Sequence, residues 1–431
     1  MNLKFYFIAF ITLLFGSCKN ESLVELKDIQ PWLQSSHINK AIANNTAEES
    51  FWKKRLAADS NNYINYLGVS KVYISRFRIL SNIADFNKGE DLLRKAASRL
   101  DNKHPDLLQS LSRVAITGHR FKEAAILNRQ SLEYNGNKYA YSLAAFDASM
   151  ELGLYKQSSR FLEQNGGKES FHYLIRLAKK QDHDGDLEAA IQSMEKAFEK
   201  VKHTNNSELY CWTLANLGDM YGHAGRIKEA YNMYRKVLES DPAYLYALKG
   251  IAWIAYAHDR NIPLAKTILT FINQHSGDPS TLLLLAELAT YEGNLKEAGM
   301  LKARFIREAG KDSYGTMHNK YLIQILAEDE ATLPAALKIA QQELRDRETP
   351  ETWSWFAWVH YKMGDYEKAN DIYTDHVMGQ TFEPEALVYG IYILGKVNWE
   401  KEASILYNEC IESAFELGPV QIAELKTFKE K

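Results

Sequence analysis

Apolar residues recur at helical spacing from residue 47 onward, and no stretch of useful length after residue 20 alternates as a strand would. The segment 211–244 is the clearest example. Its first half places small and apolar residues on one helical face, at Leu214, Leu217, Gly218 and Tyr221. Gly225 then interrupts the pattern, which resumes until a proline disfavours helix at the preceding residue. We therefore predict two helices joined by a tight turn.

This helix, turn and helix pattern repeats along the chain. The small residue Ala230 of the second helix has counterparts at intervals of 32 to 40 residues: Ala124, Ser158, Ala190, Ala265, Ala298, Ala336, Ala369 and Ala403. Glycines recur at the expected turns: Gly153, Gly185, Gly225, Gly293 and Gly364. Small side chains are expected where two helices cross closely. The spacing predicts about ten antiparallel helix pairs, each packed on its neighbours.

This order of residues resembles the tetratricopeptide (TPR) repeat over roughly residues 60–417, most closely at 211–244. The resemblance implies an all-α, right-handed superhelical solenoid, which we assign to residues 47–418, and a binding scaffold with a concave groove. Residues 419–431 are predicted to form a C-terminal capping helix that is polar on one side.

The N-terminus has the pattern of an export signal in residues 1–17. Lys4 precedes an apolar run of eleven residues, which is too short to span a bilayer core that needs about 20. Small residues then lead to Cys18, and this end resembles a bacterial lipoprotein signal. The resemblance implies that Cys18 is the lipidated first residue. A plain signal peptide with an incidental cysteine is the alternative.

Residues 18–46 are polar and irregular, and we expect them to form a tether. Lys19, in place of the aspartate that marks inner-membrane retention, favours the outer membrane. The anchored protein would face the periplasm or the cell surface.

The charge balance excludes an electrostatic nucleic-acid site. The chain has 52 basic and 55 acidic residues, a net charge of −3 that becomes −4 without Lys4 of the signal. Cys211 and Cys410 lie in distant repeats, too far apart for a disulfide in a solenoid. We expect two free, partly buried thiols.

No pattern predicts catalysis, a metal or a cofactor. HExxH, CxxC and the full phosphate-loop motif GxxxxGK[ST] are all absent. The segment 182–186 resembles a calcium loop, but the positions that need Gly and Glu hold Leu187 and Ser193. We expect a turn there, with Asp186 capping the following helix.

The groove is the candidate binding site. Its predicted lining includes large aromatic residues and one lysine, at Trp212, Tyr246, Lys249, Trp253, Tyr256, Trp358 and Tyr361. Tryptophan and tyrosine bury much area with few rotors and serve as binding anchors. The alternative is that these rings only pack between repeats.

Two functional hypotheses follow. The first is a non-catalytic, lipid-anchored envelope scaffold that binds a protein or peptide partner in its groove. The second is a glycan-binding outer-membrane lipoprotein whose Trp253 and Trp358 stack on sugar rings. A small-molecule ligand is not expected. The family's carboxylate clamp is not supported, since Asp219, Trp253 and Glu287 occupy the places of its asparagines.

Overall fold

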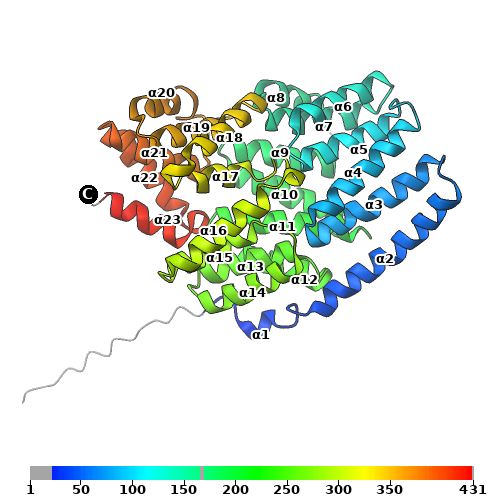
Figure 1. Ribbon diagram of the computed structural model, residues 1–431, viewed down its shortest axis with the longest axis horizontal. Helices are drawn as coiled ribbons and strands as arrows, with labels where there is room; N and C mark the ends of the chain where they lie inside the picture. The colour runs from blue at the N-terminus through cyan, green and yellow to red at the C-terminus, as the bar shows by residue number, and fades with distance from the viewer. Residues whose placement is uncertain (1–21, 166–168, 430–431) are drawn as a thin grey trace, which may run out of the picture.

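The computed structural model describes residues 22–165 and 169–429, which form 23 α-helices and two short 3-10 turns (Figure 1). No strand occurs among these residues. The predicted all-α architecture is therefore confirmed. The helices pack in sequence as a solenoid of antiparallel pairs.

Ten helix pairs follow one another between residues 63 and 412. The first five are α3 (Tyr63–Leu80) with α4 (Ile83–Ser98), α5 (Pro105–Thr117) with α6 (Phe121–Glu133), α7 (Lys138–Glu151) with α8 (Tyr155–Glu163), α9 (Phe171–His183) with α10 (Leu187–Val201), and α11 (Ser207–His223) with α12 (Ile227–Ser240). The second five are α13 (Leu245–Ala257) with α14 (Ile262–His275), α15 (Thr281–Tyr291) with α16 (Leu295–Ala309), α17 (Asn319–Leu326) with α18 (Leu333–Asp346), α19 (Pro350–Lys362) with α20 (Tyr366–His376), and α21 (Pro384–Lys396) with α22 (Glu400–Glu412). The 3-10 turns η1 (Asp312–Tyr314) and η2 (Glu330–Thr332) flank the short helix α17.

The predicted small residues lie where the two helices of a pair cross. All nine positions of this register are buried, and Ala190, Ala230 and Ala369 are fully so. Large rings fill the space beside small residues of the first helices. A Cβ on Gly218 would lie 2.6 Å from the Tyr234 ring, and one on Gly250 would lie 2.5 Å from it. Replacing any of these residues by a larger one would force the pair apart.

The five predicted turn glycines all adopt the left-handed conformation. Their φ angles lie between 70° and 87°, at Gly153, Gly185, Gly225, Gly293 and Gly364. This region of backbone space is unfavourable for residues with a Cβ. The glycines therefore let the chain reverse directly after five of the ten first helices.

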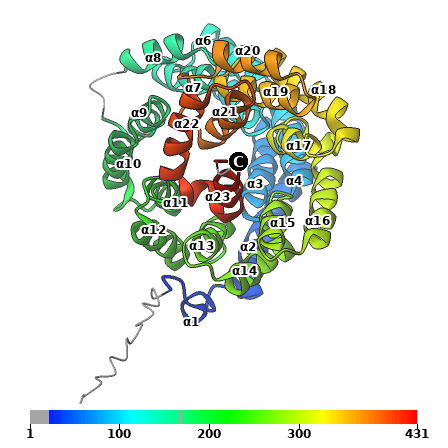
Figure 2. The same ribbon diagram turned by 90° about the vertical axis from the view of Figure 1, so that its left-hand side faces the viewer.

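The solenoid completes a turn, so that helix pairs far apart in sequence meet (Figures 1 and 2). The Gly277 N–H donates to the Leu80 carbonyl at 2.6 Å. The Asn87 amide donates to the Ser313 carbonyl at 2.9 Å, and the Thr316 hydroxyl donates to the His119 carbonyl at 3.2 Å. These contacts join the early repeats to the segment between α14 and α17. Viewed along its axis, the superhelix is therefore a closed ring of helices (Figure 2).

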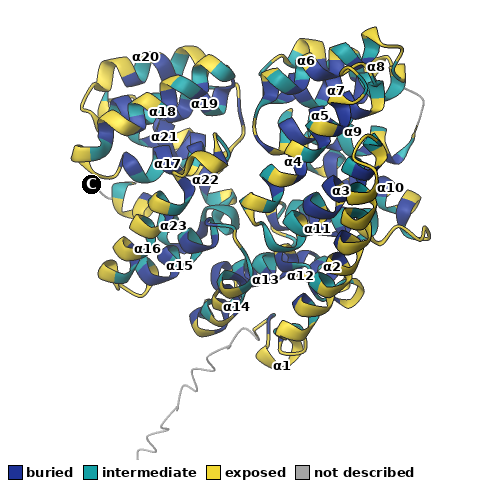
Figure 3. Cartoon of the chain, turned by 45° about the vertical axis from the view of Figure 1, so that its right-hand side comes forward, coloured by how far each residue is buried: buried dark blue, intermediate teal, exposed yellow. Residues whose placement is uncertain are grey.

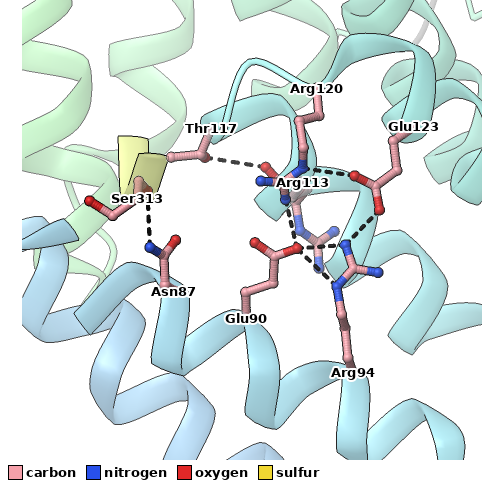
Figure 4. Close-up of polar contacts among 8 residues, drawn as sticks. All are labelled: Asn87, Glu90, Arg94, Arg113, Thr117, Arg120, Glu123 and Ser313. Carbon is pink, nitrogen blue, oxygen red and sulfur yellow. Dashed lines mark hydrogen bonds and ion pairs between the residues drawn. The ribbon is translucent and has the colours of Figure 1, made fainter. Parts of the chain in front are cut away.

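An ion-pair network stiffens the early repeats at this junction (Figure 4). Arg94 and Arg120 both bind Glu90 and Glu123, at 2.5–2.7 Å for the shortest contact of each pair. Glu90 lies on α4, whereas Arg120 and Glu123 begin α6, so the network links two consecutive pairs. Asn87, one turn before Glu90, makes the contact to Ser313.

The N-terminal region differs from the expected tether. Within 18–46, the described residues form α1 (Leu26–Ile29) and the start of α2 (Ser35–Ala58). Val24, Ile29 and Ile38 are buried in the same core as α9–α14, and this burial of apolar area holds the segment on the solenoid. Helix α2 then runs to α3 with most of its surface exposed (Figure 3). Residues 1–17 and Cys18 lie outside the described residues.

The C-terminal helix also differs from a simple end cap. Helix α23 (Ala414–Lys429) is interrupted at Gly418, next to the predicted boundary at 419. It packs on α11, α13, α15 and α21, and it lies inside the ring (Figure 2). In the part of the chain that the structure describes, no helix is long and apolar enough to cross a bilayer.

A pair of glycine substitutions tests the close packing. Gly218→Ala is expected to lower the free energy of unfolding by about 1–3 kcal/mol, because its Cβ would overlap the Tyr234 ring. Gly299→Ala on α16 meets no atom within 4 Å, so it should stabilise by up to about 1 kcal/mol through helix propensity. Thermal unfolding followed by circular dichroism compares them. Equal shifts of the two variants would contradict the close approach at Gly218.

Candidate functional site

The inner wall of the solenoid is built from the first helices of successive pairs, and α23 lies against it. The first part of α23 meets α11 and α13. The Trp253 indole N–H donates to the Phe415 carbonyl at 3.0 Å. Gly222 leaves room for the Phe415 ring, since a Cβ there would lie 3.0 Å from it. Gly418 (φ 78°) packs on the Trp253 ring, where a Cβ would be 2.8 Å away.

The last turns of α23 meet α21. The Phe428 ring contacts Tyr392 edge to face, with centroids 4.7 Å apart. Gly395 leaves space for the same ring. Leu425 is fully buried in the core formed by the later repeats. The wall thus holds an amphipathic segment through aromatic and glycine contacts.

The predicted groove residues fall into separate groups. Trp253 contacts α23 directly, and the buried Tyr256 donates to Glu287 at 2.7 Å. The Glu287 carboxylate also lies beside α23, since a Cβ on Gly418 would be 3.5 Å from its Oε1 atom. Trp358 and Tyr361 stack on each other with centroids 5.1 Å apart.

The remaining predicted residues bridge neighbouring repeats. Tyr246 donates to Asp219 at 2.8 Å, and Lys249 pairs with Asp278 at 3.2 Å. Trp212 packs edge to face on Phe171 with centroids 6.2 Å apart. The structure therefore does not gather the seven residues into one open site.

A cavity of ≈550 Å³ occupies the space inside the ring that α23 leaves free. It lies between the inner ends of α7, α9 and α11 on one side and α17–α19 and α21 on the other. Ser413 and Glu416, at the start of α23, close one side of it. The cavity has room for several side chains of a bound segment.

Carboxylates outnumber cations in this cavity. Seven acidic residues, two lysines, one arginine and three histidines line it. Each of the three cations is already paired: Lys179 with Glu151 at 2.6 Å, Lys320 with Glu385 at 2.8 Å, and Arg347 with Glu343 at 3.1 Å.

Four lining acids, Asp182, Glu351, Glu383 and Glu416, have no lysine or arginine partner among the residues that the structure describes, and Glu416 lies 4.0 Å from the His223 ring. The cavity therefore carries an excess of negative charge.

The pKa of Glu383 reflects this excess. Burial raises the pKa of its carboxyl from 4.5 to about 6, and repulsion from Glu416, Glu351 and Asp182 adds to the rise against the attraction of Lys320. Burial likewise raises the pKa of Asp182. A bound cation would reverse these shifts.

Metal binding finds no support in the described part of the chain, where no group of three or more His, Cys, Asp or Glu side chains is placed to hold an ion. Asp186 accepts a hydrogen bond from the Ala189 N–H at 3.0 Å, so it caps α10 as predicted. Cys211 and Cys410 are free, as predicted, and they are buried more completely than expected, at 2% and 0% exposure.

Sequence reasoning missed the acidic cavity and the position of α23. The cavity's acids come from helix ends and loops of distant repeats, such as Asp182 and Glu383, and no spacing signal joins them. A signal for α23 did exist: Phe415, Ile422, Leu425 and Phe428 give this short segment more apolar residues than a solvated cap needs.

The comparison with protein families agrees with the repeat at 213–244. A family model described as "Tetratricopeptide repeat" matches residues 213–244. A search of curated protein sequences finds no match. Many solved structures match.

Three of the matching structures are PilF of Pseudomonas aeruginosa, yeast Tom70 and human IFIT1. PilF has 17% identity and a TM-score of 0.37, and the match covers 50% of this chain and 96% of PilF. Yeast Tom70 has 11% identity and a TM-score of 0.35, with 93% and 100% covered. Human IFIT1, in a dimer with m7Gppp-AAAA, has 12% identity and a TM-score of 0.47, with 72% and 70% covered.

Trp253→Phe tests the docking of α23. Loss of the indole N–H leaves the Phe415 carbonyl without this donor. The free energy needed to open α23 should therefore fall by about 1 kcal/mol. Amide hydrogen exchange in residues 419–429 should accelerate, with α14 unchanged. Trp399→Phe, on a ring that is 42% exposed, is the control and should leave α23 unchanged. Unaltered exchange in Trp253→Phe would contradict the docking.

Glu383→Gln tests the charge excess. Because the folded-state pKa is raised, the wild type binds more protons when folded and loses stability as pH rises from about 4.5 to about 6. The glutamine variant lacks this loss. Its melting temperature should exceed that of the wild type at pH 8 and approach it below pH 4.5. Glu48→Gln on α2 is the control, and its difference from wild type should not vary in this way. A pH-independent difference for Glu383→Gln would contradict the crowding of carboxylates.

Proposed function

We propose that this tetratricopeptide-repeat solenoid is a non-catalytic scaffold that binds a basic peptide segment of a partner protein inside its ring. We further propose that it acts at the bacterial outer membrane, anchored by a lipid on Cys18 and facing the periplasm or the cell surface. The inner wall supports the binding of a peptide, and the sequence around Cys18 supports the anchor.

The observation that carries the peptide proposal is the acidic cavity beside α23. The inner wall already holds one amphipathic segment, through Trp253, Gly222 and Tyr392. The adjoining space of ≈550 Å³ is lined by seven carboxylates, and only three of them pair with its lysines and arginine. A lysine or arginine side chain entering this space would pair with them at reduced dielectric, where such pairs gain more than at the surface.

A preformed wall also favours binding. Its helices are ordered without the partner, so association loses little ordering entropy in the scaffold. The segment that becomes ordered on binding belongs to the partner.

The glycan alternative has less support from the site. The ring of Trp253 is covered by Gly418, and Trp358 already stacks on Tyr361 and on Tyr389, the latter at 4.6 Å. Sugar recognition by aromatic stacking needs an open ring face, and these contacts cover the faces of the two tryptophans proposed for it.

A peptide titration tests the proposal. A peptide alternating lysine with apolar residues should bind the mature protein in calorimetry, and the same peptide with glutamate for lysine should not. The double variant Asp182→Asn with Glu383→Gln should weaken binding by at least tenfold, which is about 1.4 kcal/mol. Affinity should fall as salt rises, because screening weakens charge pairing.

The matched control is the double variant Glu48→Gln with Asp371→Asn, which removes two charges from outer surfaces. It should bind like the wild type. Equal loss in both double variants would show that net charge alone matters and would overturn the cavity as the site. Crosslinked capture from native envelopes, followed by mass spectrometry, would then identify the natural partner.

A further inference from the structure

The chain from residue 22 onward is fastened to one end of the α13–α14 pair. The Leu23 and Val24 N–H groups donate to the two carboxylate oxygens of Asp259, at 3.1 and 2.8 Å, and the Ser22 hydroxyl donates to the same carboxylate at 2.9 Å. The Asp259 side chain is only 1% exposed. We call residues Ser22–Val24 with Asp259 the strap.

The segment after the strap is held as well. Val24 and Ile29 are fully buried against the core of α9–α14. The Ser35 hydroxyl and the His275 ring, at the end of α14, are 2.9 Å apart. Residues 22–35 therefore follow α14 from one end to the other, and no free tether separates the strap from the solenoid.

The strap leaves very little chain for an anchor. Three residues, 19–21, separate Cys18 from Ser22. Even fully extended, the four steps from Cys18 to Ser22 span at most about 14 Å. A tether through residue 46 could have reached about 90 Å. A lipid on Cys18 would therefore hold the strap at the bilayer surface.

We propose that the face formed by α1 and the turn between α13 and α14 lies against a lipid bilayer when Cys18 carries a lipid. The inference rests on the proposed anchor. Leu26, which is 50% exposed on α1, would meet the headgroup region.

This orientation sets what the solenoid presents to its partners. Helix α1 lies outside the ring in the view along its axis, and α20 lies at the opposite edge in both views (Figures 1 and 2). The axis of the ring would run parallel to the bilayer. Its two ends would stay open to partners, and α20 would point away from the lipid.

Chemical lipidation tests the inference apart from the natural anchor. A maleimide lipid is attached to Cys18 of the purified mature protein, whose other cysteines are buried. The protein is bound to phosphatidylcholine vesicles and acetylated at lysines. Lys27 of α1 should react several-fold more slowly on vesicles than in solution, whereas Lys368 of α20 should react alike in both. Equal reactivity changes at the two lysines would overturn the orientation.

Two variants examine the strap itself. Asp259→Ala removes the acceptor of three hydrogen bonds, so the shielding of Lys27 should fall. Asp371→Ala on α20 is the matched control and should retain it. A flexible insert of about ten Gly and Ser residues after Glu21 keeps the strap intact and lengthens the reach. It should also abolish the shielding, and persistent shielding in this variant would contradict the proposal even if Asp259→Ala fails to fold.

The natural modification is examined separately. The mass of the N-terminal peptide from the native host reports whether Cys18 carries a lipid. An unmodified Cys18 would contradict the proposed anchor without affecting the vesicle result, so the two failures are distinguishable.

Discussion

Close crossing of the two helices in each pair is the constraint on which this structure depends. Ala230 and Gly218 leave no room for larger side chains, and the Tyr234 ring fills the space between Gly218 and Gly250. Because this one ring contacts the first helices of two consecutive repeats, it fixes the angle between α11 and α13. Repetition of this angle bends ten pairs into a ring, whose junction is closed by contacts such as Asn87 with Ser313.

Ring closure gives the molecule an interior that a single helix pair cannot have. The C-terminal helix covers part of the inner wall, with Trp253 and Tyr392 as its main contacts. The rest of the interior is an acidic space where Glu383 has a raised pKa. The same repeats that build the core therefore bring together carboxylates from distant parts of the chain. This excess charge is the feature that the proposed basic partner would neutralise.

Sequence periodicity predicted the local structure well. The small-residue register and the turn glycines are local requirements of a helix pair, and Ala190, Ala369 and Gly225 lie as expected. The groove aromatics were harder to interpret, since a ring such as Tyr256 can serve an interface or a ligand equally. Contacts between distant segments left no periodic signal. The strap at Asp259 and the return of α23 into the ring both depend on the curvature summed over many repeats, which the pattern of one repeat does not determine.

Hydrogen exchange with a bound partner distinguishes binding inside the ring from binding on its outer surface. The mature protein is compared alone and with the partner segment recovered from crosslinked envelopes. Binding inside the ring should give new protection in the segments that line the acidic cavity, 179–187, 316–321 and 381–386, with the outer helices α12 and α16 unchanged. Protection confined to those outer helices, with the cavity segments unaltered, would contradict binding inside the ring.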